Sequence, residues 1–388
     1  MTQRPQGKKL LHFLFSAFIV LMFFGFLETV LYLSGFQPTI PFKKFAIPAW
    51  MEELDSLVLA KYQGFVVEQG FVNEDVYAYR PDRRYGYLLK PNLEITVSNY
   101  SSAAFIEKLP PWTIRSDSLG NRIPISHSDS QEKALETQTL HVLGDSSSFG
   151  WGVNFEDSYS QRLVQKLEET VKDRSIVLKN YSTPGFTSFQ GRLILEEKAN
   201  IKKDDLVLVS FGSNDSYPSK NSDRWHFQTR NSMAGKISWS LNRLLLVNWL
   251  RTLIYSMPEL TPVETKNRRV SLQDYQENLI SIFETILQRG GKPQFINICN
   301  RDKYREAAVE TAKALQVPFY NFPEIFDSYL SKVHDLYPEK FVTYFEAYGE
   351  LIEKETQLVF LFPDLCHPNA IGHQLMADIV AAEGKIFN

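Results

Sequence analysis

Apolar residues are distributed along this chain in two different ways. Residues 10–34 form one almost continuous apolar run, LLHFLFSAFIVLMFFGFLETVLYLS, interrupted by a single acidic residue, Glu28. At about 1.5 Å of rise per residue, a helix of about 25 residues crosses the roughly 30 Å hydrocarbon core of a bilayer. From about residue 140 onward, short apolar runs instead alternate with segments of helical periodicity. The pattern predicts one N-terminal transmembrane helix and a later domain built from strands and helices.

The flanks of the apolar run indicate its orientation. Arg4, Lys8 and Lys9 precede it, which favours a cytoplasmic location for residues 1–9 and an exported remainder. A cleaved signal peptide is the alternative, but its apolar region is usually only about 7–15 residues long and ends at a small-residue site that this run lacks. A buried core helix is disfavoured because the run is apolar on every side. We therefore expect an uncleaved single-pass anchor over residues 10–34, with the rest of the chain periplasmic or extracellular.

Five short apolar runs predict buried strands in the C-terminal part of the chain: HVLGDS (141–146), IVLKNYS (176–182), DLVLVSFGSND (205–215), PQFINIC (293–299) and VPFYNF (317–322). Segments with helical spacing separate them at residues 158–171, 191–199, 272–287 and 306–315. Strands that are apolar throughout and alternate with helices predict an α/β fold with a parallel sheet covered on both faces.

Two regions do not follow this alternation. Residues 35–137 show scattered prolines and many aromatics without long helical periodicity, and we interpret them as a stalk followed by an irregular, partly β N-terminal region. The segment KISWSLNRLLLVNWLRTLIY (236–255) is helical in pattern, with Ile237, Leu241 and Leu244 on one face. We favour a helix packed on the core for this segment, and a lid or acyl-binding helix is the alternative.

Composition and charge narrow the function. The 388 residues carry a formal net charge of −3, so there is no basic surplus to neutralise phosphates, and we expect no nucleic-acid partner. No His, Cys or carboxylate grouping has the spacing of a metal site, and neither a phosphate loop nor a dinucleotide fingerprint is present, so we expect no metal and no cofactor. Cys299 and Cys366 are predicted near the same sheet edge; we expect two unpaired thiols, with a disulfide as the alternative outside the cytoplasm.

Polar residues follow the predicted strands at the sheet edge where open α/β sheets bind ligands. Ser146 comes after the first strand, where a turn into a helix exposes its hydroxyl. Gly185 follows the second strand, and its N–H can approach a substrate closely because no side chain intervenes. Asn214 follows the third strand, and its amide can donate to a developing oxyanion.

A carboxylate and a histidine near the C-terminus complete this set. Asp364 lies three residues before His367, a spacing at which the carboxylate can orient the imidazole and stabilise the imidazolium. The histidine can then accept the serine proton. The α/β-hydrolase fold does not account for these residues, because its nucleophile elbow requires G-x-S-x-G and Ser146 lies in Gly-Asp-Ser-Ser-Ser. We expect Asp145, Asp215, His141 and His373 to have structural roles.

The sequence resembles the SGNH/GDSL hydrolase superfamily over about residues 140–382, in four blocks: GDSSSFGWG (144–152), NYSTPGF (180–186), GSND (212–215) and DLCHPNAIGH (364–373). The resemblance implies a three-layer α/β/α sandwich with a flavodoxin-like, five-stranded parallel sheet. It places this hydrolase-like domain in residues 138–388, with an insertion at residues 216–270.

The resemblance also implies roles for single residues. Ser146 is then the nucleophile, His367 the base and Asp364 the carboxylate that orients it. The backbone N–H groups of Ser146 and Gly185 and the side chain of Asn214 form the oxyanion hole. These roles imply a membrane-anchored serine hydrolase that cleaves acyl esters of a lipid or an acylated glycan. An O-acyltransferase that modifies envelope polysaccharide shares every catalytic residue and remains the alternative, while a non-catalytic glycan-binding or assembly protein is disfavoured by the four intact blocks.

Overall fold

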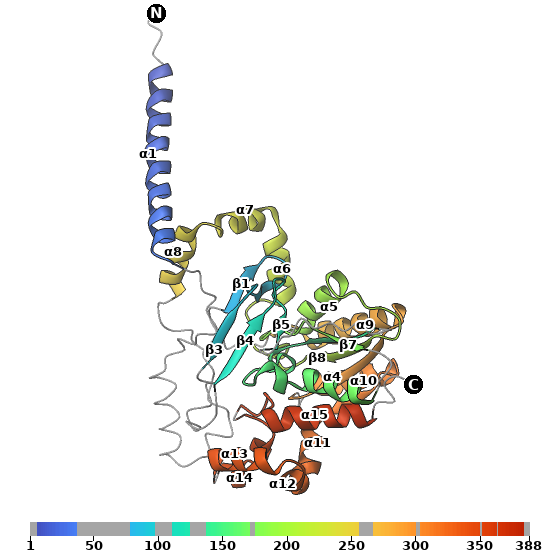
Figure 1. Ribbon diagram of the computed structural model, residues 1–388. Coiled ribbons are helices and arrows are strands. Elements are labelled where there is room, and N and C mark those ends of the chain that lie inside the picture. Colours follow the sequence, from blue (N-terminus) through green and yellow to red (C-terminus); the bar gives the residue numbers. More distant parts are fainter. Residues whose placement is uncertain are drawn as a thin grey trace, which may run out of the picture.

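The computed structural model describes residues 6–36, 78–97, 111–124, 137–170, 175–255, 267–299, 303–349, 351–362 and 364–383. Residues 37–77, which hold most of the predicted stalk, lie outside the described residues. A long N-terminal helix stands clear of a body that contains the sheets and the remaining helices (Figure 1).

The N-terminal helix, α1 (Gln6–Leu33), contains the apolar run. Its segment Lys9–Leu33 is 25 residues long with a mean hydropathy of 2.4, and none of its most apolar stretch is buried. The core-helix alternative is therefore wrong. The helix is long and apolar enough to span a membrane or to act as a signal sequence.

A five-stranded parallel sheet lies at the centre of the body, in the order β10–β9–β8–β6–β7. Its strands are β6 (Thr137–Gly144), β7 (Ser175–Asn180), β8 (Leu206–Ser210), β9 (Lys292–Asn297) and β10 (Phe319–Asn321). The first strand in sequence is flanked by the second and the third, which is the flavodoxin-like order. The predicted fold class is confirmed. In such sheets a ligand-binding crevice lies at the carboxyl ends of the strands where the order reverses, which here is between β6 and β8.

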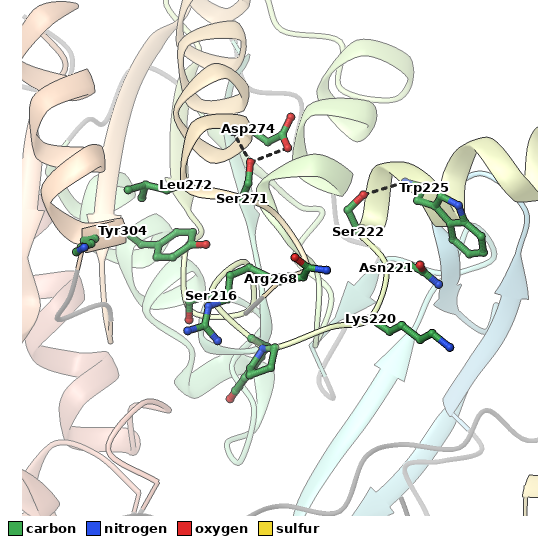
Figure 2. A pocket seen from close by; sticks show the side chains of 14 residues that line it. Ser216, Lys220, Asn221, Ser222, Trp225, Arg268, Ser271, Leu272, Asp274 and Tyr304 are labelled. Atoms are coloured by element: carbon green, nitrogen blue, oxygen red, sulfur yellow. Dashed lines mark hydrogen bonds between the residues drawn. The ribbon is translucent and has the colours of Figure 1, made fainter. Parts of the chain in front are cut away.

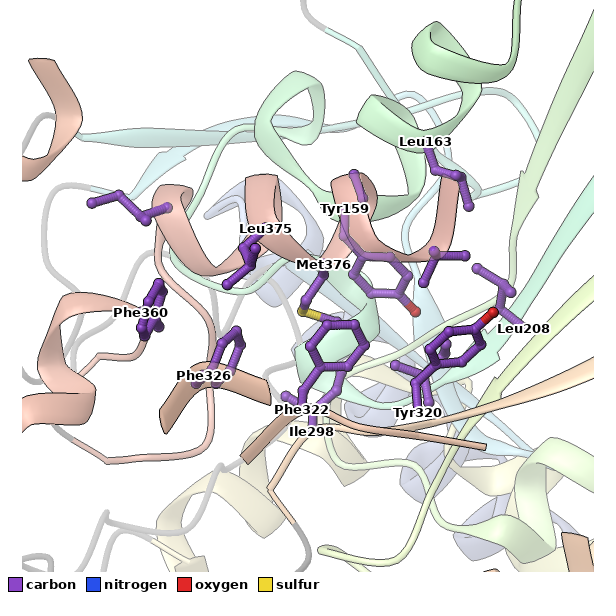
Figure 3. Close-up of a cluster of buried hydrophobic side chains, with 14 of the residues drawn as sticks. Tyr159, Leu163, Leu208, Ile298, Tyr320, Phe322, Phe326, Phe360, Leu375 and Met376 are labelled. Carbon is purple, nitrogen blue, oxygen red and sulfur yellow. The ribbon is translucent and has the colours of Figure 1, made fainter. Parts of the chain in front are cut away.

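Helices cover both faces of this sheet. One layer consists of α4 (Tyr159–Thr170), α11 (Phe322–Tyr329) and α15 (Ala370–Glu383), and its core is shown in Figure 3. There Tyr159 of α4, Phe322 and Phe326 of α11 and Met376 of α15 are fully buried, packed over Leu208 of the sheet. Full burial of each such side chain contributes about 1.5–3 kcal/mol, so this layer anchors α15, which follows the predicted site residues at 364–373.

The other face carries α5 (Ser188–Glu197), α9 (Leu272–Gln288) and α10 (Lys303–Ala314). Apolar side chains at helical spacing, such as Leu279, Ile282 and Phe283, form the buried face of α9. Ser271 caps this helix by accepting the N–H of Asp274 at 3.1 Å. The two layers and the sheet between them make up the predicted three-layer sandwich.

Smaller elements surround this sandwich. Short helices are α3 (Ser146–Phe149), α6 (Asp223–Asn231), α7 (Met233–Leu241), α8 (Leu245–Tyr255), α12 (Val333–Leu336), α13 (Pro338–Tyr348) and α14 (Leu351–Lys354), with 3-10 helices η4 (Phe155–Asp157), η5 (Leu330–Lys332) and η6 (Thr356–Val359). Antiparallel strands precede the sandwich: β1 (Tyr79–Asp82) pairs with β2 (Gly86–Leu89), and β3 (Glu94–Val97), β4 (Trp112–Ser116) and β5 (Arg122–Ile123) form a second sheet.

These antiparallel strands support the loop that follows Ser146. The buried Arg122 donates to the carbonyl oxygens of Phe149, Gly150 and Val153 at 2.5, 2.8 and 2.6 Å. Its guanidinium also lies 4.4 Å from the centre of the Phe149 ring. Because one side chain binds three carbonyl groups, it fixes the backbone of residues 149–153, which follow Ser146 at the end of α3.

The segment at 236–255 differs from its favoured prediction. It forms two helices, α7 and α8, and no residue of the described stretch 233–253 is buried. The core-packing interpretation is wrong, because α7 extends from α6 and α8 packs against the end of α1 rather than on the sheet (Figure 1).

Candidate active site

The carboxyl ends of β6, β7 and β8 bring the predicted site residues to one edge of the sheet. Ser146 follows β6 directly, at the start of α3. The chain after β7 returns to β6, where the N–H of Thr183 donates to the carbonyl of Gly144 at 3.2 Å. The chain after β8 returns as well, and the Asn214 side chain reaches Asp145. Three strands that are far apart in sequence thus present their end loops together.

Ser146, His367 and Asp364 form a continuous hydrogen-bonded chain. The Oγ atom of Ser146 lies 2.6 Å from Nε2 of His367, and Nδ1 of His367 lies 2.6 Å from Oδ2 of Asp364. The His367 side chain is 10% exposed and that of Asp364 21%, so the chain is mostly shielded from water. Such an arrangement can pass the serine proton to the imidazole while the carboxylate stabilises the resulting charge.

A tight turn holds Asp364 and His367 in this geometry. The Oδ1 atom of Asp364 accepts the N–H groups of Cys366 at 3.0 Å and of His367 at 2.9 Å. Leu365, between them, has a φ of +53°, a left-handed conformation that is costly for a residue with a branched side chain. Each carboxylate oxygen of Asp364 therefore has its own function, one holding the turn and the other the imidazole.

Nearby carboxylates raise the pKa of His367. Burial lowers the pKa of His367, but the charges of Asp364 and Asp145 and the Asp364 hydrogen bond outweigh it, so the pKa lies above its usual value. Burial raises the pKa of Asp145 to about 6, against the lowering influence of His367 and of its hydrogen-bond donors. The imidazolium that proton transfer creates is thus stabilised by its surroundings.

Asp145 also orients Asn214. One of its oxygens accepts the Ser147 N–H at 3.0 Å, which caps α3 as expected for a structural role. The other accepts the Asn214 Nδ2 at 3.2 Å. Because an amide carries two N–H donors, this bond fixes the Asn214 side chain and leaves a second donor for a ligand. No local sequence pattern indicates this contact.

Gly185 lies in a loop held by residues that the sequence analysis missed. Its φ is +78°, and a Cβ there would lie 2.4 Å from the Tyr87 hydroxyl oxygen, so only glycine fits. Tyr87 donates to the Pro184 carbonyl at 2.5 Å, and Nη1 of Arg269 donates to the Gly185 carbonyl at 2.7 Å. Asp223, at the start of α6, holds Arg269 through an ion pair of 2.8 Å.

The two cysteines correct a prediction. Cys299 and Cys366 form a disulfide, with Cα atoms 4.7 Å apart, whereas we expected unpaired thiols. The reason is the topology: the chain after β9 and the turn that carries His367 meet at the same sheet edge, within bridging distance. The bridge ties this turn to the end of β9.

Two further histidines in the interior make contacts away from the Ser146–His367–Asp364 chain. His141 is fully buried on β6 with its Nε2 3.1 Å from Asp205, and burial lowers its pKa. His373 is fully buried on α15, where Nδ1 accepts the Tyr159 N–H at 3.2 Å. Within the described ranges, no group of three or more His, Cys, Asp or Glu side chains is arranged to hold a metal ion.

A model of a known protein family matches this chain. The model of the GDSL-like lipase/acylhydrolase family matches residues 142–375, which include all four sequence blocks. The chain belongs to this family. Ester hydrolysis is the activity that the family describes, and the predicted resemblance is confirmed.

GDSL-type proteins are also found among similar solved structures. The esterase EstA from Pseudoalteromonas sp. is 15% identical, with 65% of this chain and 100% of that chain covered and a TM-score of 0.35. The lipase/acylhydrolase from Enterococcus faecalis is 16% identical, with 63% and 94% covered and a TM-score of 0.36. A putative GDSL-like lipase from Parabacteroides merdae is 14% identical, with 66% and 99% covered and a TM-score of 0.37. No curated protein sequence matches the chain.

A cleft lies next to the loop that carries Asn214, and none of Ser146, Asp364 and His367 lines it. Its volume is ≈ 1120 Å³, and its walls come from the insertion and from the starts of α9 and α10 (Figure 2). Tyr217 lines the cleft and is hydrogen-bonded to the site loop, because its N–H donates to the Asn214 carbonyl at 3.4 Å. Lys220, Arg268 and Lys303 bring three cationic side chains to the lining. The described acidic group of the lining, Asp274, already pairs with Arg224 at 2.9 Å.

Proposed function

We propose that this GDSL-family protein is a serine hydrolase that cleaves acyl esters with Ser146 as its nucleophile. The observation that carries the proposal is the hydrogen-bonded chain from Ser146 through His367 to Asp364, with both links at 2.6 Å. A serine hydroxyl is a weak nucleophile without a base in contact with it, and His367 supplies that base.

The reaction follows from these positions. His367 Nε2 takes the proton of Ser146 as Oγ attacks the acyl carbonyl, and Asp364 stabilises the imidazolium. The oxyanion of the tetrahedral intermediate accepts hydrogen bonds from the N–H groups of Ser146 and Gly185 and from the Asn214 amide. The C–O bond to the alcohol then breaks, and the alkoxide takes the proton from His367. Water, deprotonated by His367, releases the acyl group from Ser146 by the reverse sequence.

The cleft beside Asn214 is the proposed binding site for the alcohol portion of the substrate. Its lining combines apolar and polar surface, and Lys220, Arg268 and Lys303 make it cationic. Exposed aromatic side chains, Trp225 at 46% and Tyr217 at 52%, offer flat faces against which a sugar ring can pack. An acylated glycan that carries carboxylate or phosphate groups fits this chemistry better than a lipid.

The same cleft supports a second candidate, an O-acyltransferase. A cleft with cationic side chains, near the loop that carries Asn214, can bind a sugar whose hydroxyl replaces water as the acceptor. Incubation with a small acyl donor, with and without an acidic glycan, distinguishes the two. Hydrolysis gives the free acid in both reactions, whereas transfer gives acylated glycan that mass spectrometry detects.

The cleft is tested by the double variant Lys220→Ala, Arg268→Ala. We expect kcat/KM for an acetylated acidic glycan to fall by about tenfold or more, because each charge-assisted contact contributes about 1.5–3 kcal/mol. Hydrolysis of p-nitrophenyl acetate, which is too small to reach the cleft, stays unchanged. Lys313→Ala, on α10 outside the cleft, is the matched control. Equal loss on both substrates contradicts the assignment of the cleft.

The proposed location follows from α1. We propose that residues 10–34 anchor the protein once in the membrane and that the hydrolase domain, residues 138–388, lies on the extracytoplasmic side. The length and hydropathy of Lys9–Leu33 support the anchor, and the basic residues before it support the orientation. Protease added to spheroplasts or intact cells degrades the hydrolase domain if this is correct and leaves it intact if the domain is cytoplasmic.

A further inference from the structure

Helices α7 and α8 expose an apolar surface outside the hydrolase core. On α7, Met233, Ile237 and Leu241 follow one another at intervals of four residues and are 74%, 59% and 50% exposed. On α8, Trp249 and Leu250 are 38% and 47% exposed. Large apolar surfaces on helices that no core covers are typical of sites that bind a partner or a membrane.

The position of α8 identifies what this surface faces. Both carboxylate oxygens of Glu28, on α1, accept backbone N–H groups at the start of α8, those of Leu245 at 2.5 Å and Leu246 at 2.9 Å. The two helices are in contact along this end (Figure 1). An acidic residue inside an apolar helix is thus used to cap the start of another helix, where negative charge is favoured.

The length of α1 sets the depth of this contact. Glu28 follows Lys9, the first residue of the apolar span, by about five helical turns, which is roughly 28 Å at 1.5 Å per residue. The hydrocarbon core is about 30 Å thick, so with Lys9 at the cytoplasmic boundary Glu28 reaches the opposite one. The start of α8 then lies where lipid tails give way to headgroups.

The chemistry of the helix pair fits that boundary. Residues 233–255 contain three basic residues, Lys236, Arg243 and Arg251, and no Asp or Glu. Two tryptophans, Trp239 and Trp249, lie among the apolar residues. Exposed apolar side chains with interspersed basic residues and tryptophans are the signature of helices that lie in the interface of a membrane with anionic lipids.

We propose that α7 and α8 lie in the extracytoplasmic membrane–water interface and bind anionic phospholipid headgroups. The inference rests on the proposed membrane anchor. It makes the insertion a second membrane contact, which together with α1 fixes the orientation of the hydrolase domain at the membrane.

Helix α6 lies between these membrane-facing helices and the candidate active site. This helix precedes α7 directly, and its first residue, Asp223, pairs with the Arg269 side chain that binds the Gly185 carbonyl. The Phe227 ring, also on α6, packs on Phe189 of α5 with ring centres 5.6 Å apart. Helix α6 thus links α7 and α8 to the loop that carries Gly185.

Site-directed spin labelling of the full chain in nanodiscs tests the inference. The nanodiscs contain phosphatidylcholine with a minority of phosphatidylglycerol. Both native cysteines are in the disulfide, so single new cysteines, Ile237→Cys on α7 and Leu250→Cys on α8, can be labelled selectively. Collisions with oxygen report lipid, and collisions with a water-soluble nickel chelate report water.

Two controls make the result specific. Phe18→Cys, in the middle of α1, reports whether the anchor spans the bilayer. Val342→Cys is a matched exposed apolar site, 48% exposed on α13, at the end of the body away from α1 (Figure 1). Labels on α7 and α8 are expected to show several-fold more oxygen collisions and several-fold fewer nickel collisions than the label at Val342.

The other possible outcomes contradict either the interfacial placement of α7 and α8 or the membrane anchor. Nickel access at Ile237 and Leu250 equal to that at Val342, with Phe18 in lipid, contradicts the interfacial placement and leaves the anchor intact. Low access to both reagents on α7 and α8 means that protein, such as a second copy of the chain, covers the surface, and this too overturns the proposal. Water access at Phe18 contradicts the anchor itself.

Discussion

Replacing Asp364 by asparagine separates the two functions of this carboxylate. Its Oδ1 accepts the N–H groups of Cys366 and His367, so the amide oxygen of an asparagine must take that position to keep the turn. The amide NH2 then faces Nδ1 of His367, where Oδ2 now lies at 2.6 Å. An NH2 group donates only, so the imidazole must place its proton on Nε2, facing Ser146.

The expected loss is large because the base is then unavailable. With the proton on Nε2, the imidazole cannot accept the Ser146 proton, and the wrong tautomer in an analogous triad lowers kcat about 10⁴-fold. This corresponds to about 5.5 kcal/mol of transition-state free energy. The fold is retained because the amide oxygen still holds the turn, so the melting temperature changes little.

The pH profile supplies a second, independent readout. Asp364 and Asp145 raise the pKa of His367, so in the wild type the base is protonated and kcat/KM falls as the pH drops through that raised pKa. In Asp364→Asn one of the two stabilising charges is gone, and the acid limb of the residual activity moves to lower pH. Stopped-flow hydrolysis of p-nitrophenyl acetate between about pH 5 and pH 9 measures both effects.

Asp335→Asn is the matched control for this variant. Asp335 also lies beside a histidine, with its Oδ1 3.3 Å from Nδ1 of His334, but the pair is exposed and far from Ser146 in sequence. It should have wild-type kinetics. A loss of less than tenfold in Asp364→Asn, with the acid limb unmoved, refutes the assignment of Asp364 as the residue that orients the base.

Three further changes test the surroundings of the site. The double variant Asp223→Asn, Arg269→Met removes the hydrogen bond to the Gly185 carbonyl without leaving a buried charge unpaired. We expect kcat for p-nitrophenyl acetate to fall by about 10- to 10²-fold while KM stays nearly constant. The single variant Asp223→Asn should have a smaller effect on kcat. Gly185→Ala, at a φ of +78°, should lower kcat by about 10²-fold, and wild-type kcat excludes Gly185 from the oxyanion hole. Replacing Cys299 and Cys366 by serine opens a loop with a sequence separation of 67 and should lower the free energy of unfolding by about 4 kcal/mol in urea titrations; an unchanged midpoint contradicts this.

The parallel sheet could be predicted from sequence because its strands are short runs of apolar residues. All five residues of β8 are buried, and such runs alternate with helices, so the parallel direction of the strands follows from the pattern. The strand order was implied by the family resemblance. Helix boundaries were less accurate: α5 begins at Ser188, three residues earlier than predicted, although Thr187 and Gln190 form a capping box that is visible in the sequence. The four blocks also pointed to Ser146, His367 and Asp364, which form one hydrogen-bonded chain in the structure.

What the sequence could not provide was contact between distant segments. Tyr87 and Arg269 reach the Gly185 loop from positions that no local pattern connects to it. The disulfide depends on a Cα separation of 4.7 Å that composition does not reveal. Periodicity also showed that residues 236–255 have an apolar face, but it could not show whether the core or something else covers that face.

Labelling with a fluorophosphonate tests whether Ser146 is the nucleophile. A fluorophosphonate reacts with a serine only when a base activates its hydroxyl, as His367 does here at 2.6 Å from Ser146. We expect stoichiometric labelling of the wild-type chain, a tryptic peptide that carries the phosphonate on Ser146, and no labelling of Ser146→Ala. Equal labelling of both proteins, or of neither, contradicts the assignment of Ser146 as the nucleophile.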